Sequence, residues 1–307
     1  MTSKNNKLFV LRVLLPGILV LLGIYLYPVL RTISMSFFAV EGPSTPLSKW
    51  TWAGLSNYVK LLHSKDFVRA YSNSIKYLFV GGALVIGCSI LQGIVLSNKA
   101  NLPGRNTFKV LIYMPNMISA VAIGHAYTHF VFQEEFGLLT TIWKWFGATP
   151  IEWLTGPNKF YAMVISVVFT GAGYYMMLMT AGIENIPDDL YEAAVLDGAN
   201  GWQKFIHITL PLMKGTIQTI VTFWSIGAMN MFIWNQVFSP RGMETSTVSP
   251  ILLMYSVVFG NALGDASGAA SETAAGLGAA IGVITALSVQ IIYTISTRLL
   301  KSDDVEL

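Results

Sequence analysis

The sequence predicts an all-α integral membrane protein, and three observations lead to this fold class. The 307 residues are 53% hydrophobic and only 11% charged, whereas about a quarter of the residues of an ordinary soluble domain are charged. Six apolar runs are each long enough to cross a bilayer as a helix, which takes about 20 residues. Basic residues cluster beside the ends of these runs, and the net charge of +3 is too small to favour a nucleic-acid partner.

The predicted spans follow one another along the chain. They cover residues 10–37, 70–96, 108–132, 160–182, 216–238 and 274–299. We therefore divide the chain into a cytoplasmic tail (1–9), a first helix with its outer connection (10–69), a five-helix core (70–300) that includes a cytoplasmic loop (184–215), and a C-terminal tail (301–307). Pro16, Pro28 and Pro115 are expected to kink their helices, because neighbouring helices in a membrane re-satisfy the carbonyls that proline frees. Such breaks favour a transport function.

The basic residues that flank the spans predict which side faces the cytoplasm. They lie near the first span, in the second connection and after the last span: Lys4, Lys7, Arg12, Lys99, Arg105, Lys109, Arg298 and Lys301. With six crossings all three groups share one side, and the positive-inside rule makes that side, with both termini, cytoplasmic. The outer connection, residues 40–69, holds several lysines against this rule. We expect no cleavable signal peptide, and the single cysteine, Cys88, excludes an internal disulfide.

A polar segment between the fourth and fifth spans lies on the same side as the basic clusters. A proline and two aspartates at residues 187–189 are predicted to start a helix, because carboxylates complement the positive end of the helix dipole. Gly198 is expected to end that helix. A second short helix from residue 202 is predicted to stop at Pro211. The segment is therefore expected to form a hairpin of two helices outside the bilayer.

This hairpin resembles the EAA loop of the membrane subunits of ATP-binding-cassette importers. The matching pattern is Glu192-Ala193-Ala194, then Gly198, then Ile208-x-Leu210-Pro211. The run from 191 to 199 is similar to the carbohydrate branch of that family, and family patterns recur at residues 52–58, 104–108 and 136–138. The resemblance implies six transmembrane helices of the type I importer permease fold, in a bacterial inner membrane.

In that family the loop docks into a groove on a separate ATPase. The coupling residues that the resemblance implies are Glu192, Ala193, Ala194, Asp197, Gly198 and Ala199. Such a contact needs a short rigid helix whose small residues let a partner approach closely. The alternative is that Glu192 is an ordinary solvated carboxylate, but the complete spacing favours coupling. Apolar surface toward the protein's own body or toward the partner is expected from Leu196, Trp202, Phe205 and Ile208.

Polar and aromatic residues inside the spans predict a substrate pathway, because polar groups are expensive in a membrane and mark function or helix contacts. Sugars present hydroxyls around an apolar ring face, so a sugar site needs amides and aromatic rings. The candidates are Asn116, Gly171, Tyr174, Tyr175, Trp224, Asn230 and Asn235. The resemblance to maltose-type permeases implies that residues of these spans hold the sugar. The alternative is that both asparagines of the fifth span bridge helices and Trp224 marks a helix interface.

Three other patterns concern metal binding, helix packing and nucleotide binding. His125 and His129 are four residues apart, which can suit a metal, but a metalloprotease would need Glu where Ala126 stands. We interpret them as hydrogen-bonded histidines and expect no metal site. Gly278 and Gly282 form a small-xxx-small pair that lets the sixth helix pack closely. No Gly-x-x-x-x-Gly-Lys-Ser/Thr sequence is present, so ATP and Mg must be bound by a separate ATPase and this chain needs no cofactor.

The resemblance implies a transport subunit rather than an enzyme. Its expected partners are a second homologous permease, two cytosolic ATPases, an extracytoplasmic solute-binding protein, a sugar or oligosaccharide, and the lipid bilayer. A polyol, sugar phosphate or other small solute is the alternative cargo. An ion-coupled secondary transporter would need carboxylates or histidines in the middle of its spans, and none occurs there. A membrane enzyme would need a nucleophile with a base, or a metal set, and the sequence offers neither. The sequence does not decide which sugar is carried.

Overall fold

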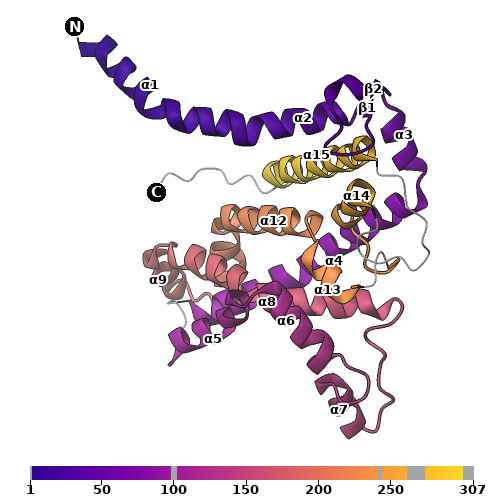
Figure 1. Cartoon of the computed structure of the whole chain (residues 1–307). Helices are drawn as coiled ribbons and strands as arrows, with labels where there is room; N and C mark the ends of the chain where they lie inside the picture. The colour runs from indigo at the N-terminus through magenta and orange to yellow at the C-terminus, as the bar shows by residue number, and fades with distance from the viewer. Residues whose placement is uncertain (1, 98–101, 241–243, 261–273, 300–307) are drawn as a thin grey trace.

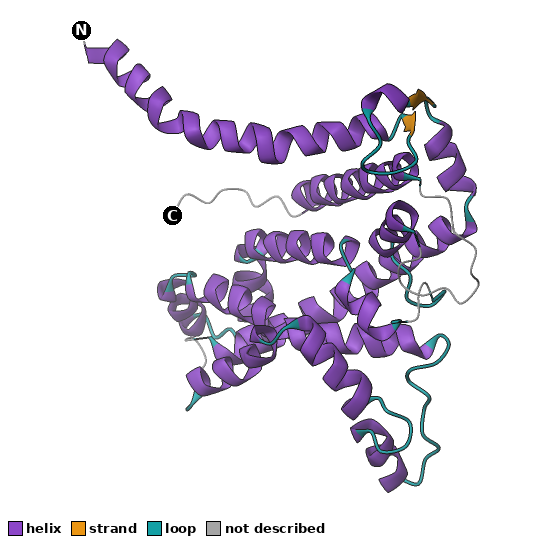
Figure 2. Ribbon diagram, viewed as in Figure 1, coloured by secondary structure: helices purple, strands orange, loops and turns teal. Residues whose placement is uncertain are grey.

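The computed structural model is almost entirely helical (Figures 1 and 2). It describes residues 2–97, 102–240, 244–260 and 274–299. The basic residues Lys99 and Lys301 and the tail 301–307 lie outside this part of the chain. Figure 1 shows a long N-terminal helix beside α15, and a helical body that holds the remaining elements. The all-α prediction is confirmed.

The first predicted span is one long helix made of α1 (Thr2–Val20), a π-helical turn η1 (Leu21–Leu26) and α2 (Tyr27–Met35). Pro16 lies inside α1, and the helix continues through it, so a kink at Pro16 stays a prediction. Pro28 follows directly after η1, where the altered π-helical register accommodates a residue that has no backbone N–H. The apolar length of this helix is not buried within the chain, and α2 packs beside α15.

The outer connection folds into a small cap. Strand β1 (Phe38–Ala39) pairs antiparallel with β2 (Thr51–Trp52), with the 3-10 turn η2 (Leu47–Lys49) between them and helix α3 (Ser56–His63) after them. Asn57 is buried in α3, and its side-chain amide donates to the carbonyls of Ser36 at 2.9 Å and Phe38 at 3.0 Å. This asparagine belongs to the family-like run at 52–58, and it fixes the cap to the end of the first span.

The body is built around α4 (Lys65–Leu96), α8 (Asn158–Glu184) and α12 (Lys214–Met229), which pack against one another. Helix α5 (Arg105–Met117) also packs on α8, and the chain then turns by 97° into α6 (Ala120–Ala126) and the π-helical η3 (Tyr127–Val131). This bend comes just after Pro115, where a kink was predicted. Helix α7 (Leu138–Trp145) follows and lies at the far end of the body in Figure 1.

The last part of the chain is more broken than predicted. The run expected as a fifth span is divided into the 16-residue α12 and the short α13 (Ile233–Phe238), with α14 (Pro250–Phe259) before α15 (Ala275–Leu299). Gly278 of α15 lies directly against Val258 of α14, which is the close packing predicted for this helix. Four helices among the described residues are long and apolar enough to cross a membrane, or five if the bent pair counts as one span. The count of six crossings therefore stays a prediction.

The polar segment between α8 and α12 forms the predicted hairpin. Helix α9 (Asp188–Leu196) is followed by α10 (Gly201–Lys204), the π-helical η4 (Phe205–Thr209) and α11 (Leu210–Leu212). The helical backbone continues one residue past Pro211 and ends at Leu212, so the predicted stop is correct to within one residue. Pro211 lies in the first turn of α11, after the π-helical segment, and a missing N–H does little harm at that position.

Candidate functional site: a coupling hairpin and a membrane cavity

Local sequence determines how the first helix of the hairpin begins and ends. Asp188 and Asp189 occupy the first turn of α9, where negative charge is stabilised by the helix dipole. At the other end Gly198 adopts φ +76°, a left-handed conformation that costs other residues about 1–2 kcal/mol. Its N–H donates to the carbonyl of Val195 at 3.0 Å, and the N–H of Ala199 donates to Ala194 at 2.8 Å. The glycine thus reverses the chain within two residues.

The second helix begins with a reciprocal cap. The backbone N–H of Gln203 donates to the side-chain oxygen of Asn200 at 2.9 Å, and the N–H of Asn200 donates to the side chain of Gln203 at 2.8 Å. This capping box satisfies two backbone donors that a helix start leaves without partners. Both ends of the turn are therefore specified by residues within the hairpin itself.

Contacts within the hairpin and at its base hold it against the body. The hydroxyl groups of Tyr191 and Thr209 lie 2.8 Å apart and join α9 to η4, and Tyr191 and Ile208 pack against the main buried cluster of the protein. At the base of the hairpin, Lys109 of α5 forms an ion pair with Glu184 of α8 at 3.1 Å. These contacts fix the hairpin at one end of α8.

The outer surface of the hairpin is apolar and uncovered. The side chains of Leu196 and Trp202 are 89% and 70% exposed, and Glu192 is also exposed. A shallow depression of about 370 Å³ lies between the two helices. Four of the six predicted coupling residues line it: Ala194, Asp197, Gly198 and Ala199. The other two, Glu192 and Ala193, are exposed on α9, so all six lie on the hairpin.

A cavity of about 640 Å³ lies within the helical body. Six of the seven predicted pathway residues line it: Asn116, Gly171, Tyr174, Tyr175, Trp224 and Asn230. They come from α5, α8, and α12 with the residue that follows it. No charged side chain is among the described residues that line this cavity, whose polar groups are amides and hydroxyls. Such a surface suits a neutral ligand with hydroxyl groups and an apolar face.

Trp224 joins α12 to α4 as well as lining the cavity. Its side chain is only 4% exposed, and its indole N–H donates to the carbonyl of Leu78 at 2.9 Å. The ring stacks on Tyr77 with centroids 5.0 Å apart. It also lies over Gly81 and Gly82, where added Cβ atoms would approach it to 2.5 and 2.9 Å. Trp224 is therefore a helix contact as well, as the alternative interpretation held.

Three other predicted residues that line the cavity, Asn116, Asn230 and Tyr174, are less buried than Trp224. Asn116 is exposed in the last turn of α5, and Asn230 is exposed at the end of α12, with its amide donating to the carbonyl of Ile226 at 3.0 Å. Tyr174 is partly buried and contacts Tyr175 edge-on, with ring centroids 5.3 Å apart. The side chains of Asn116 and Asn230 can therefore reorient toward a ligand without losing a buried partner.

Asn235 does not line the cavity. It is 2% exposed, and its side-chain amide donates to the carbonyl of Thr247. The hydroxyl groups of Ser239 and Thr247 also lie 2.6 Å apart. Asn235 therefore holds α13 to the segment before α14, which is the helix-bridging alternative. Its polar side chain signalled a buried contact but could not show which one.

Among the lining residues that the sequence analysis missed are Tyr77, Thr170 and Trp234. Thr170 directly precedes a predicted residue, Gly171, so its position on the same helix was a usable signal. Tyr77 lies on α4, and its place beside Trp224 depends on a long-range helix pairing that no local pattern indicates.

His125 and His129 lie on neighbouring turns. The Nδ1 atom of His129 is 2.9 Å from the carbonyl oxygen of His125 and 3.0 Å from the Thr128 hydroxyl. Among the described residues no group of three or more His, Cys, Asp and Glu side chains could hold a metal ion. The pair therefore makes local backbone contacts in this structure.

Comparison with known proteins agrees with this geometry. The family described as "Binding-protein-dependent transport system inner membrane component" matches residues 86–302. The chain belongs to this family. AraP, the arabinooligosaccharides transport system permease protein of Bacillus subtilis, is 31% identical to this permease over 218 residues, which are 71% of this chain and 67% of AraP. The trehalose/maltose permease MalF of Thermococcus litoralis is 27% identical over 244 residues, 79% of this chain and 81% of MalF.

A solved structure shares the fold of this permease. It is a bacterial ABC transporter involved in the import of the acidic polysaccharide alginate, with a TM-score of 0.77 and 21% identity over 98% of this chain and 97% of that chain. The predicted resemblance to importer permeases and the type I permease fold are thereby confirmed. Subunits of this family transport solutes and are not enzymes.

Proposed function

We propose that this permease forms half of the translocation pathway of an ATP-driven importer for a neutral sugar or oligosaccharide. The observation that carries the proposal is the uncharged cavity lined by amides and aromatic rings. Sugar hydroxyls need hydrogen-bonding partners, and the apolar faces of sugar rings pack on aromatic side chains. The relatives AraP and MalF, whose names refer to arabinooligosaccharides and to trehalose and maltose, support this class of substrate.

The hairpin supplies the coupling in this proposal. Its exposed apolar residues, Leu196 and Trp202, would be covered by a cytosolic ATPase, and the small residues at 193–194 and 198–199 would let that partner approach closely. Because helix α8 carries Tyr174 in its length and joins the hairpin at its end, a displacement of the hairpin would move one wall of the cavity. In this proposal the hairpin and both termini face the cytoplasm.

The complete importer would contain a second homologous permease, two ATPases and an extracytoplasmic solute-binding protein. A solved complex of similar fold contains an alginate pentasaccharide-bound periplasmic protein, which supports such a delivery partner. ATP binding would draw the two hairpins together and turn the cavity outward, and hydrolysis would reset it. This is alternating access by rigid-body motion of the permeases.

The chemistry of the cavity lining also distinguishes between the alternative cargoes. A sugar phosphate carries negative charge, and binding it in a low-dielectric site calls for a cation, whereas the cavity lining contains none. An ion-coupled mechanism would need an ionisable group beside the substrate, which is also absent from the described lining. A polyol satisfies the amides but offers no ring face to Tyr174 and Trp224. A neutral sugar fits best.

The test is a cargo screen with the purified complex and its solute-binding protein in nanodiscs. ATP hydrolysis is measured with neutral oligosaccharides, polyols, sugar phosphates and amino acids, each with the unloaded binding protein as control. We expect stimulation by a neutral oligosaccharide alone. Stimulation only by an amino acid or a sugar phosphate would overturn the substrate proposal and leave the importer assignment standing.

A further inference from the structure

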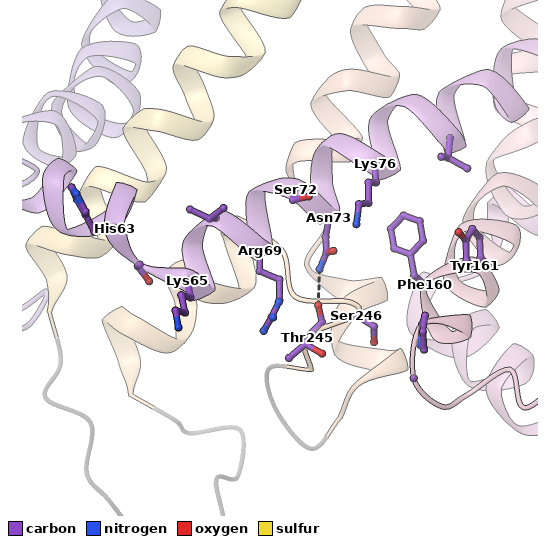
Figure 3. Close-up of a pocket in the computed structure, with 15 residues that line it drawn as sticks. His63, Lys65, Arg69, Ser72, Asn73, Lys76, Phe160, Tyr161, Thr245 and Ser246 are labelled. Atoms are coloured by element: carbon purple, nitrogen blue, oxygen red, sulfur yellow. Dashed lines mark hydrogen bonds between the residues drawn. The ribbon is translucent and has the colours of Figure 1, made fainter.

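A second, larger cavity is separate from the cavity of about 640 Å³ that we propose to hold the sugar, called the sugar cavity below. This groove has a volume of about 870 Å³ and is bounded by the start of α4, the start of α8 and the segment at 245–246 (Figure 3). Helix α8 leads from this groove to the coupling hairpin through 27 residues, about 40 Å of helix at 1.5 Å per residue. If the hairpin is cytoplasmic, as proposed above, the groove opens on the outer side of the membrane. The inference below rests on that proposed function.

The groove is strongly basic. Lys65, Arg69 and Lys76 line it from α4, at spacings of four and seven residues that place them on one face of the helix. Figure 3 shows Arg69 and Lys76 projecting on the side of α4 that faces Thr245. All three cations are exposed, and none forms an ion pair with any described residue. No carboxylate is among the described residues that line the groove.

The walls of the groove are fixed. The side-chain amide of Asn73, on the same face of α4, donates to the carbonyls of Thr245 at 3.0 Å and Val248 at 3.1 Å. Next to the lining residues Phe160 and Thr245, Lys159 forms an ion pair with Glu244 at 2.6 Å, so these two charges offset each other. The helix that carries the three cations is thus bonded to the segment at 245–248, and the described residues that line the hollow include no carboxylate.

These cations also run against the positive-inside rule. Lysine and arginine are depleted on the outer side of membrane proteins near the span ends, yet this outer segment carries a stripe of them. An outer ligand of negative charge would account for their presence. The described lining of the sugar cavity has no charged residue, so a cargo selected by its negative charge would lose its counter-charge on the way through. The ligand of the groove is therefore not the cargo.

The length of the stripe indicates what kind of ligand fits. Lys65 and Lys76 are eleven residues apart on α4, which corresponds to about 16 Å along the helix. A single phospholipid phosphate spans only part of that distance, whereas a peptide loop of about five extended residues covers it at 3.3 Å per residue. We propose that this groove receives an acidic loop of the extracytoplasmic solute-binding protein that delivers the sugar.

The test uses the whole importer in nanodiscs of uncharged lipid, together with the solute-binding protein that supports uptake. We compare Arg69→Gln/Lys76→Gln with Lys49→Gln/Lys60→Gln, which removes the same amount of charge from the outer connection but outside the groove. The readout is the concentration of solute-binding protein that gives half-maximal stimulation of ATP hydrolysis. The charge-preserving variant Arg69→Lys/Lys76→Arg controls for folding.

The groove pair is expected to raise that concentration about tenfold at about 50 mM salt, with much less effect at about 300 mM, because salt screens the attraction. Maximal stimulation and basal hydrolysis should be unchanged, the control pair should differ by less than about twofold, and the charge-preserving variant should behave like the wild type. Equal shifts in both pairs, or none, would overturn the proposal. So would a shift that appears only when anionic phospholipid is added, since the groove would then hold a headgroup. If no solute-binding protein stimulates the wild-type complex, the proposed function itself fails.

Discussion

The hairpin and the sugar cavity are built in opposite ways. The turn of the hairpin is stabilised by hydrogen bonds between residues three to five apart, such as Ala199 to Ala194, and the large apolar side chains of Leu196 and Trp202 are exposed. The cavity is assembled from segments far apart in the chain, such as Leu78 and Trp224, and its ring contacts are buried. A change in the hairpin should therefore affect a partner, while a change in the cavity wall affects the fold.

The largest expected difference concerns the side of the membrane that each segment faces, because a thiol is either accessible from outside the cell or not. In a Cys88→Ser background, Ser44→Cys in the outer cap and Asn106→Cys at the start of α5 place one thiol each at exposed positions. In intact cells a membrane-impermeant thiol reagent should label Ser44→Cys and leave Asn106→Cys unmodified, as the basic clusters predict. Permeabilised cells serve as the control, in which both thiols should react. The reverse pattern would place the hairpin outside the cell, where it could not contact a cytosolic ATPase.

Trp224 should be the most costly side chain to remove from the cavity wall. Trp224→Ala leaves a void over Gly81 and Gly82 and removes the indole hydrogen bond to the Leu78 carbonyl, and we expect the free energy of unfolding to fall by roughly 3 kcal/mol. Thermal unfolding of the purified complex in detergent measures this loss. Phe223→Ala on the more exposed side of the same helix is the matched control, and equal destabilisation of both variants would show that Trp224 is not a special contact.

The contrast between the two regions also explains what the sequence could predict. The start of α9 at Asp188 and its end at Gly198 follow from helix-end chemistry and could be predicted to within a residue or two. The sequence also placed Tyr174 and Asn230 correctly beside one cavity, because polar groups inside apolar runs are rare. Asn235 looked the same in sequence but bonds Thr247, since only the tertiary fold decides which partner a buried amide meets.

The breaks in the helices were harder to predict. Pro16 and Pro211 are both tolerated inside helical backbone, while the fifth predicted span breaks at residues 230–232, where the sequence contains no proline. Proline removes only one donor and its effect depends on whether neighbouring turns can adjust, as the π-helical turns beside Pro28 and Pro211 do. Local sequence does not carry that information.

Asn230 should give the smallest effect, because its side chain is exposed and makes no buried contact. Asn230→Ala is expected to remove one hydrogen bond to the sugar, worth about 1 kcal/mol, and so to raise the sugar concentration for half-maximal uptake several-fold. Assembly and basal ATP hydrolysis should stay unchanged. Asn106→Ala, which lies outside the cavity, is the control. Wild-type uptake kinetics in Asn230→Ala would exclude this amide from the pathway.

The most direct test of the account compares both regions in one assay, the amount of sugar imported per ATP hydrolysed in proteoliposomes. Gly198→Val forces a β-branched residue into φ +76°, strains the turn by about 1–2 kcal/mol and adds bulk where we propose that the ATPase docks, so we predict hydrolysis with little import. Gly201→Val, which has open space and no positive φ, should keep the wild-type ratio. Tyr174→Ala should also keep the wild-type ratio, but it should need a higher sugar concentration for half-maximal import. A wild-type ratio in Gly198→Val would contradict the coupling role of the hairpin.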